Sequence, residues 1–315
     1  MPDVLPSGAF TFQEAADAGV TVGRLRHHSL ATPSRGIRQP LHPPLPELES
    51  VVRPLTLVTE FSAASHATAF TLWSFPGFLP GKGDPVTHIS RPDTMAIPRR
   101  GGVRGHRGQF FADEVVTHNG LLITSRVRTW LDCSRKMSIE ELTVVADHLL
   151  RIPRPEFEGR SEPYATMEDL EDMLDRHKGT PGIRKARVAL ERARVGSDSA
   201  QETKLRLALE DASLPEPLLN VRTLLGAGVV RQPDLSYPER KVAVEYDGEG
   251  HSEAGQVVRD IARDEDFSRA GWLLVRISKR HMERDARPAV GKVHSALLSR
   301  GWSPNWVAAD VGIRA

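Results

Sequence analysis

The feature that most constrains this chain is an alternating run at 242–247, which lies inside a series of helix and strand patterns spanning residues 199–278. Val242, Val244 and Tyr246 fall on one face of a strand, and the intervening residues fall on the other. Helical patterns precede and follow the strand patterns in this segment. The series therefore predicts an α/β (α+β) unit whose elements follow the order αβββαβ.

Each element of this unit has a local signal in the sequence. Turn residues separate the runs, and a hairpin that turns around residues 239–240 places Asp234 opposite Glu245, with both side chains on one face. The last apolar run is typical of an interior strand. We expect a helix at 201–209, a first strand at 220–223, hairpin strands at 232–237 and 241–248, a helix at 253–269 and a final strand at 271–278.

Carboxylates gather in this predicted unit. Glu202 shares the inward face of its helix with Leu205, while Asp234, Glu245 and Asp247 share one face of the sheet. An inward carboxylate is costly unless it is paired or binds a cation, and acids on one face repel each other. Cross-strand Cβ atoms lie about 5 Å apart, within the reach of two carboxylates that share one hard cation. We therefore predict a divalent-cation site here.

Titratable and basic residues follow the acids. His251 comes four residues after Asp247 and could donate or accept a proton near a reacting group, because an unperturbed histidine has a pKa of about 6.5. Arg259 and Arg263 are spaced i, i+4 on the next predicted helix and project from one side of it. They could clamp a phosphate, or they could form ion pairs with the neighbouring acids of that helix.

These residues resemble the restriction-endonuclease-like PD-(D/E)xK superfamily over about residues 199–285, most closely its very-short-patch-repair (Vsr-like) branch and a related actinobacterial domain family of unassigned function. The resemblance implies hydrolysis of DNA phosphodiester bonds that depends on Mg²⁺ (or Mn²⁺), with Asp234 and Glu245 as metal ligands and Glu202 as the helix acid. The motifs that match in order are Pro233-Asp234, Glu245-Tyr246-Asp247-Gly248 with His251, Arg259-Asp260 with Arg263-Asp264, and Gly271-Trp272.

The sequence departs from the main superfamily pattern at one position. A lysine usually stands two residues after the second acid, and here Asp247 stands there, as the Vsr-like branch also lacks the lysine. His251 or a second metal must then position the nucleophile. The alternative function is a non-catalytic DNA-binding transcriptional regulator or antitoxin that keeps a nuclease fold, and a third interpretation is a solvent-facing sheet edge decorated with acids. Nicking that depends on Mg²⁺ and is lost in Asp234→Ala would distinguish the enzyme.

The first forty residues contain a second pattern. Two short helices at 12–18 and 22–28, joined by a glycine-containing turn, fit a helix-turn-helix, and 35–38 could form a wing strand. Arg24 and Arg26 lie on the second helix. They are candidate DNA contacts, while the alternative is a solvated helix face.

This N-terminal region resembles the abortive-infection antitoxin-like (AbiEi-type) family over about residues 8–150. The resemblance implies a winged-helix-like start followed by a mixed α/β module. It rests on the helix pair, Ser65-His66-Ala67-Thr68-Ala69, Leu72-Trp73 and residues 124–132. His66 is the lone histidine of an apolar helix, so we interpret it as a core or cap residue rather than a ligand. The basic strip at 99–107 predicts phosphate contacts or a β-edge kept charged.

Length and composition set the remaining limits. With 315 residues the chain is longer than a usual single domain. We divide it into an antitoxin-like N-terminal region at 1–150, a helical linker at 151–198, an endonuclease-like domain at 199–290 and a tail at 291–315. Within the linker we expect helices at 166–177 and 181–194. The 42 basic and 41 acidic residues nearly cancel, so the net charge of the chain does not indicate a nucleic-acid or membrane partner. The single cysteine, Cys133, excludes an intrachain disulfide framework. We expect a cytoplasmic protein that binds DNA rather than membranes, as a monomer or homodimer.

Overall fold

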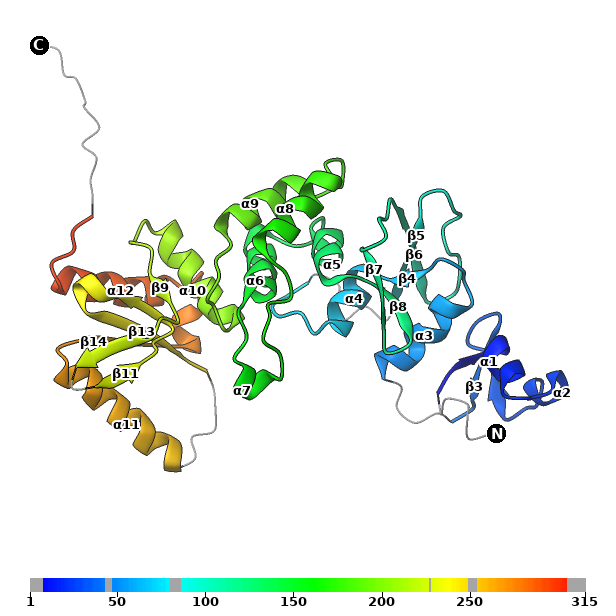
Figure 1. Ribbon diagram of the computed structural model, residues 1–315, viewed down its shortest axis with the longest axis horizontal. Coiled ribbons are helices and arrows are strands. Elements are labelled where there is room, and N and C mark those ends of the chain that lie inside the picture. The colour runs from blue at the N-terminus through cyan, green and yellow to red at the C-terminus, as the bar shows by residue number, and fades with distance from the viewer. Residues whose placement is uncertain (1–7, 43–46, 80–85, 227, 249–253, 305–315) are drawn as a thin grey trace, which may run out of the picture. The chain divides into compact units, whose positions relative to one another are not determined.

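The computed structural model (Figure 1) describes residues 8–42, 47–79, 86–226, 228–248 and 254–304. It is a mixed α/β protein with several sheets, and none of its described helices is long and apolar enough to cross a membrane. Two compact units are present, Met1–Val145 with Ala165–Glu191, and Ala146–Tyr164 with Arg192–Ala315. Residues 165–191, which we assigned to a linker, therefore belong to the first unit.

The second unit is built on a four-stranded mixed sheet in the order β14-β13-β12-β9. β13 runs antiparallel to β12 and parallel to β14, and β12 runs antiparallel to β9. Together with its helices, this sheet follows the predicted order αβββαβ and then adds a further helix. The elements are α10 (Ala200–Asp211), β9 (Leu218–Leu219), β12 (Leu235–Tyr237), β13 (Val242–Asp247), α11 (Ala254–Arg269), β14 (Leu273–Ser278) and α12 (Arg287–Ser299).

Two strand predictions for this unit were wrong. The first strand of the sheet is at 218–219 instead of 220–223, because the chain then leaves the sheet and forms a separate hairpin of β10 (Thr223–Gly226) and β11 (Val229–Arg231). The final strand is an edge strand of this sheet and not an interior one, since β13 is its one partner in the sheet. Its apolar character reflects helices on both faces rather than strands on both sides.

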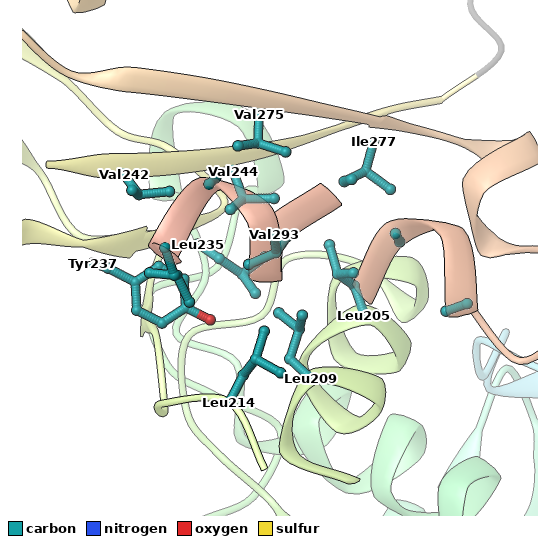
Figure 2. Close-up of a cluster of buried hydrophobic side chains, with 14 residues drawn as sticks. Leu205, Leu209, Leu214, Leu235, Tyr237, Val242, Val244, Val275, Ile277 and Val293 are labelled. Atoms are coloured by element: carbon teal, nitrogen blue, oxygen red, sulfur yellow. The ribbon is translucent and has the colours of Figure 1, made fainter. Parts of the chain in front are cut away.

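The side chains of β13 alternate between two faces as predicted, and each face contributes to an apolar layer, which the sequence did not predict. Val242 and Val244 pack with Leu205 of α10 and Val293 of α12 in the main core, which Figure 2 shows. Ala243 points to the other face and packs with Phe267 of α11. The sheet therefore lies between α10 and α12 on one side and α11 on the other (Figure 1).

The final helix changes our assignment of the C-terminal tail. We placed a tail at 291–315, but α12 continues to Ser299 and buries Val293, Ala296 and Leu297 in the main core. Residues 291–299 are therefore part of this unit, because their apolar face covers the sheet. Residues 305–315 lie outside the described part of the chain.

The first unit begins with a small module of two helices and a three-stranded sheet in the order β1-β3-β2. Thr11 and Thr21 cap the two helices as predicted, but the second helix ends at Leu25, three residues earlier than expected. The predicted wing is part of β3, displaced by two residues. The elements are β1 (Phe10–Thr11), α1 (Phe12–Asp17), α2 (Val22–Leu25), β2 (Leu30–Ala31) and β3 (Ile37–Pro40).

A five-stranded mixed sheet in the order β6-β5-β4-β8-β7 forms the rest of this unit, with helices packed around it. Its basic strip at 99–107 is partly in the edge strand β6, which agrees with the charged β-edge that we expected as one alternative. The elements are α3 (Leu48–Leu57), β4 (Ala63–Ala64), α4 (His66–Leu72), β5 (Thr87–Pro92), β6 (Val103–Gly108), β7 (Val115–His118), β8 (Leu121–Thr124), α5 (Arg126–Cys133), α6 (Ile139–Leu150), α8 (Met167–Arg176) and α9 (Ile183–Arg192). α6 contains the boundary between the units.

The main core of the second unit predicts a clear stability difference between two leucines. Leu205 is fully buried, so Leu205→Ala should lower the free energy of unfolding by about 2–5 kcal/mol through lost burial and a residual cavity. Leu224 is 67% exposed, so Leu224→Ala should change it by only about 0.5 kcal/mol. Urea denaturation of the full chain, followed by circular dichroism, measures both. Equal losses would contradict the core assignment.

Candidate functional site

Asp234 and Glu245 face each other at the end of the β12–β13 hairpin. The hairpin pairs Leu235 with Val244, so the next pair outward is Asp234 with Glu245, which confirms the predicted register. A short 3-10 turn at Pro238–Arg240 closes the hairpin where we expected it. The backbone N–H of Tyr246 donates to Asp234 Oδ2 at 2.7 Å. Because that amide belongs to the residue after Glu245, it holds the Asp234 carboxyl beside Glu245.

Glu202 lies at the start of α10 and points inward, as predicted. Its side chain is buried, but its carboxylate accepts three hydrogen bonds, from the Asp198 N–H at 2.9 Å, the Ser199 hydroxyl at 2.8 Å and the Asn220 side-chain amide at 2.7 Å. Asn220 also donates its backbone N–H to the Asp234 carbonyl at 2.9 Å. Glu202 is therefore satisfied by donors and does not need a cation for its burial, contrary to our expectation.

The three acids influence one another electrostatically. Burial, followed by the nearby charge of Glu202 and then of Glu245, raises the pKa of Asp234 to about 7. Burial also raises the pKa of Glu202 and of Glu245, although donors and cations around each one partly offset this effect. The like charges of the cluster are therefore destabilising as they stand, which is the condition that a bound cation relieves.

Two arginines partly neutralise the cluster. Arg263 of α11 forms an ion pair with Glu245 and donates to the Gln232 carbonyl at 2.8 Å. These partners lie outside its own helix, while the side chain of Asp260 lies outside the described residues and the phosphate contact stays a prediction. Arg276 of β14 contacts Asp264 at 2.6 Å and Asp247 at 3.3 Å. Asp247 is 54% exposed, so it lies at the outer margin of the cluster.

The acids do not all meet around one point. Among the described residues, no three carboxylates have ligand oxygens within 4.8 Å of one another, and the group that meets this condition is formed by three histidines of the first unit. The pair of half-buried Asp234 and buried Glu245 fits a hard divalent cation by its donor type. Glu202 does not join them in a shared three-carboxylate ligand set, because the ligand oxygens of the three residues do not all lie within 4.8 Å of one another.

The remaining predicted residues fall into two groups. His251 and the side chain of Arg259 lie outside the described residues. Arg24 and Arg26 are exposed at the C-terminal end of α2, where they can reach a ligand. Of the two arginines predicted to project from one side of α11, the structure therefore describes the side chain of Arg263 alone.

A cleft adjoins the carboxylates within the second unit. Its volume is about 760 Å³, and Asn220 and Asp198, which hold Glu202, are among the residues that line it. Arg154, Arg222 and Arg231 line the same cleft, of which Arg154 pairs with Asp198 and Arg231 with Asp266. A cleft with arginines beside buried acids can accept a phosphate chain and present it to a cation.

Sequence reasoning missed several of these residues. Asn220 was assigned to a strand, and Arg276 was not considered, because only the fold brings them to the acids. The spacing Ser199-x-x-Glu202 is a helix-capping signal that could have shown why Glu202 turns inward. His66, which we interpreted as isolated, lies beside His88 and His106 of neighbouring strands.

The raised pKa of Asp234 predicts how stability changes with pH. The unfolded chain releases this proton near pH 4 and the folded chain near pH 7, so the unfolded state binds fewer protons in between and stability falls as pH rises through that window. Asp234→Asn removes this loss. With chelator present, the difference in free energy of unfolding between Asp234→Asn and the wild type should grow in favour of the variant by on the order of 2 kcal/mol from pH 5 to pH 8.

Denaturant titrations at a series of pH values measure this difference. The matched control is Glu239→Gln, which removes an exposed carboxylate in the hairpin turn of the same unit. Its curve should run parallel to that of the wild type. A parallel curve for Asp234→Asn as well would show that the Asp234 carboxyl is not perturbed.

Two curated proteins of Mycobacterium tuberculosis are similar to part of this chain. The uncharacterized protein Rv2248 of strain H37Rv and the uncharacterized protein MT2308 of strain CDC 1551 are each 28% identical to it over 160 residues. The alignment covers 50% of this chain and 55% of each relative, so the chain spans about half the length of the curated relatives it matches. No protein-family model and no solved structure matches the chain.

Proposed function

We propose that the second unit is a metal-dependent DNA endonuclease of the Vsr-like, restriction-endonuclease-like type. The observation that carries this proposal is the opposed pair of half-buried Asp234 and buried Glu245 at the end of an antiparallel hairpin, near a cleft lined by arginines. The αβββαβ order of the sheet and its helices supports it, because this is the order that the resemblance implies.

The chain's own residues would divide the work as follows. Asp234 and Glu245 would hold Mg²⁺ or Mn²⁺, which supplies Lewis-acid stabilisation of the phosphoryl oxygens when bound. The Tyr246 amide fixes the orientation of the Asp234 carboxyl, and Asn220 fixes Glu202 next to it. Glu202 contributes negative charge close to the cation rather than a direct ligand, since three donors occupy its oxygens.

The arginines would recognise the DNA backbone. Arg222 is exposed and lines the cleft with Arg154 and Arg231, which form ion pairs with Asp198 and Asp266, so Arg222 would make the first contact with a phosphate. In the first unit, Arg24 and Arg26 are exposed on the small N-terminal module, which is the element that we propose contacts duplex DNA. Phosphate contacts of this kind position the duplex and carry no sequence information.

One observation favours the alternative, a non-catalytic DNA-binding regulator or antitoxin that keeps a nuclease fold. Arg263 forms an ion pair with Glu245 and so supplies, from within the chain, part of the positive charge that a cation would bring. Asp247 also stands where the superfamily's lysine usually stands. Such a protein would bind DNA equally well with and without a divalent metal.

Nicking of supercoiled plasmid separates the two functions. Wild-type protein should nick it with Mg²⁺ or Mn²⁺ and not with EDTA, and Asp234→Asn should lower the rate at least about 100-fold because it removes a charged ligand. Glu239→Gln, in the same hairpin but away from the acids, should keep the wild-type rate.

The outcomes of this experiment exclude each other. Equal nicking by wild type and Asp234→Asn would identify a contaminating nuclease and overturn the assignment. Absence of cleavage, together with a metal-independent footprint on duplex DNA, would establish the regulator instead. Supercoiled, linear and mismatched substrates are tested in parallel, since the Vsr-like branch implies a structural preference.

The N-terminal arginines make a separate prediction about salt. The double variant Arg24→Ala/Arg26→Ala should bind duplex DNA more weakly, and the slope of log K against log salt concentration should become shallower by about 2, because two phosphate contacts are lost. Arg187→Ala removes an exposed arginine of α9 and serves as the control. Fluorescence anisotropy between low and high salt measures the slopes, and unchanged slopes would mean that this module does not contact phosphates.

A further inference from the structure

Three histidines from separate elements meet in the first unit. His66 begins α4, His88 lies in β5 and His106 lies in the neighbouring parallel strand β6. His106 Nε2 and His88 Nδ1 are 3.0 Å apart, and the rings of His66 and His106 stack with centroids at 3.8 Å. One ring nitrogen from each of the three lies within 4.8 Å of the others. This histidine cluster is separate from the carboxylates described above.

The backbone around the histidine cluster is closely held. The Thr68 hydroxyl of α4 accepts the His88 N–H at 2.8 Å, and the Ser65 N–H donates to the His88 carbonyl at 3.1 Å, so the start of α4 is fastened to β5 at this residue. His66 itself has a left-handed backbone, with φ of 50°. A non-glycine residue keeps this conformation only where its surroundings impose it.

A glycine next to the cluster fixes the position of β6. A Cβ added to Gly105 would lie 2.4 Å from the Pro98 carbonyl oxygen, which is closer than any real contact. Only glycine therefore allows the preceding segment to pack against β6 at this point. The adjacent His106 is held against His88 as a result.

A buried carboxylate provides an independent sign of a missing ligand. Asp132 of α5 has a side chain that is 5% exposed, and its Oδ1 accepts from Arg128 Nε at 2.9 Å. Its Oδ2 has no hydrogen-bond partner and lies 4.0 Å from His66 Nδ1, and so it faces the cluster. An unpartnered buried carboxylate oxygen is costly, and a cation at the histidines would satisfy it.

We propose that His66, His88 and His106 bind one divalent transition-metal ion of the zinc class, with Asp132 beside them as the carboxylate of the site. Imidazole ligands select zinc and its neighbours, whereas Mg²⁺ and Ca²⁺ take oxygen ligands. Bonds of ~2.0–2.1 Å to a tetrahedral zinc ion place two nitrogens about 3.3 Å apart. The 3.0 Å between His88 and His106 is close to that spacing.

The competing explanation is a purely structural stack of neutral rings. In that arrangement His106 Nε2 and His88 Nδ1 share a hydrogen bond at 3.0 Å, and His66 Nδ1 lies 3.0 Å from the Ser65 hydroxyl oxygen. A stack explains the packing of the rings, but it leaves Asp132 Oδ2 unsatisfied. The 27% exposure of the His66 side chain gives an ion a path into the site.

Cobalt provides a direct probe of this site. The full chain is stripped with chelator and titrated with Co²⁺, which should produce a visible d–d absorption band that saturates at one equivalent and is abolished by Zn²⁺. Zn²⁺ should also raise the unfolding temperature of the wild type, because it binds the folded state. His66→Asn should weaken Co²⁺ binding by about 100-fold or more, and asparagine tolerates the left-handed backbone there.

Further variants distinguish the alternatives. His118→Gln changes a histidine at the opposite edge of the same sheet and should bind Co²⁺ as the wild type does. Asp234→Asn should also retain binding, because it lies in the second unit, so a failed nuclease assay would leave this result unaffected. His106→Gln should lose both the band and the stabilisation by Zn²⁺, with circular dichroism confirming that it folds. A wild type without a cobalt band, or Co²⁺ binding as tight as the wild type's by His66→Asn and His106→Gln, would overturn the proposal.

Discussion

The register of the β12–β13 hairpin is the constraint on which the candidate site depends. Pairing Leu235 with Val244 places Asp234 opposite Glu245, and the Tyr246 amide then holds the Asp234 carboxyl against the second strand. The same register directs Val242 and Val244 into the main core. A slip of one residue would exchange the two faces and bury the acids among leucines. The apolar core and the acidic site are therefore positioned by one pairing, which makes stability of the hairpin a condition for any chemistry there.

Charge compensation around the acids explains how such a cluster survives in the fold. Glu202 is stabilised by three hydrogen-bond donors, and Glu245 by the ion pair with Arg263. Burial and the nearby charge of Glu202 raise the pKa of Asp234 to about 7. The charges of Glu202 and Glu245 are thus compensated by groups of the chain itself, whereas the carboxyl of Asp234 is the least compensated of the three. The ion pair of Arg263 with Glu245 is the structural argument for the non-catalytic alternative.

The two units present two different kinds of donor to a cation. Oxygen donors gather at a hairpin end in the second unit, while nitrogen donors gather between α4, β5 and β6 in the first. Oxygen donors suit Mg²⁺ or Mn²⁺, and imidazoles suit zinc. Under the two proposals, the first unit would carry an ion that joins one helix to two strands, while the second would carry the ion used in hydrolysis. The two donor sets lie in different units, so variants in each unit test one proposal.

Local signals in the sequence were sufficient to predict the alternating strand 242–247, the hairpin turn at 239–240 and the opposition of Asp234 and Glu245. They were also sufficient for the caps at Thr11 and Thr21, since each of these features depends on residues that are close in the chain. Tertiary structure alone decided that β14 is an edge strand and that His66 has two histidine neighbours. It also decided that Asn220 donates a hydrogen bond to Glu202 and that Arg263 forms an ion pair with Glu245. The physical reason is that periodicity reports which face of an element is buried, but not which distant element covers it. The contacts between distant elements depend on how their side chains pack together, and this packing forms only when the whole unit folds.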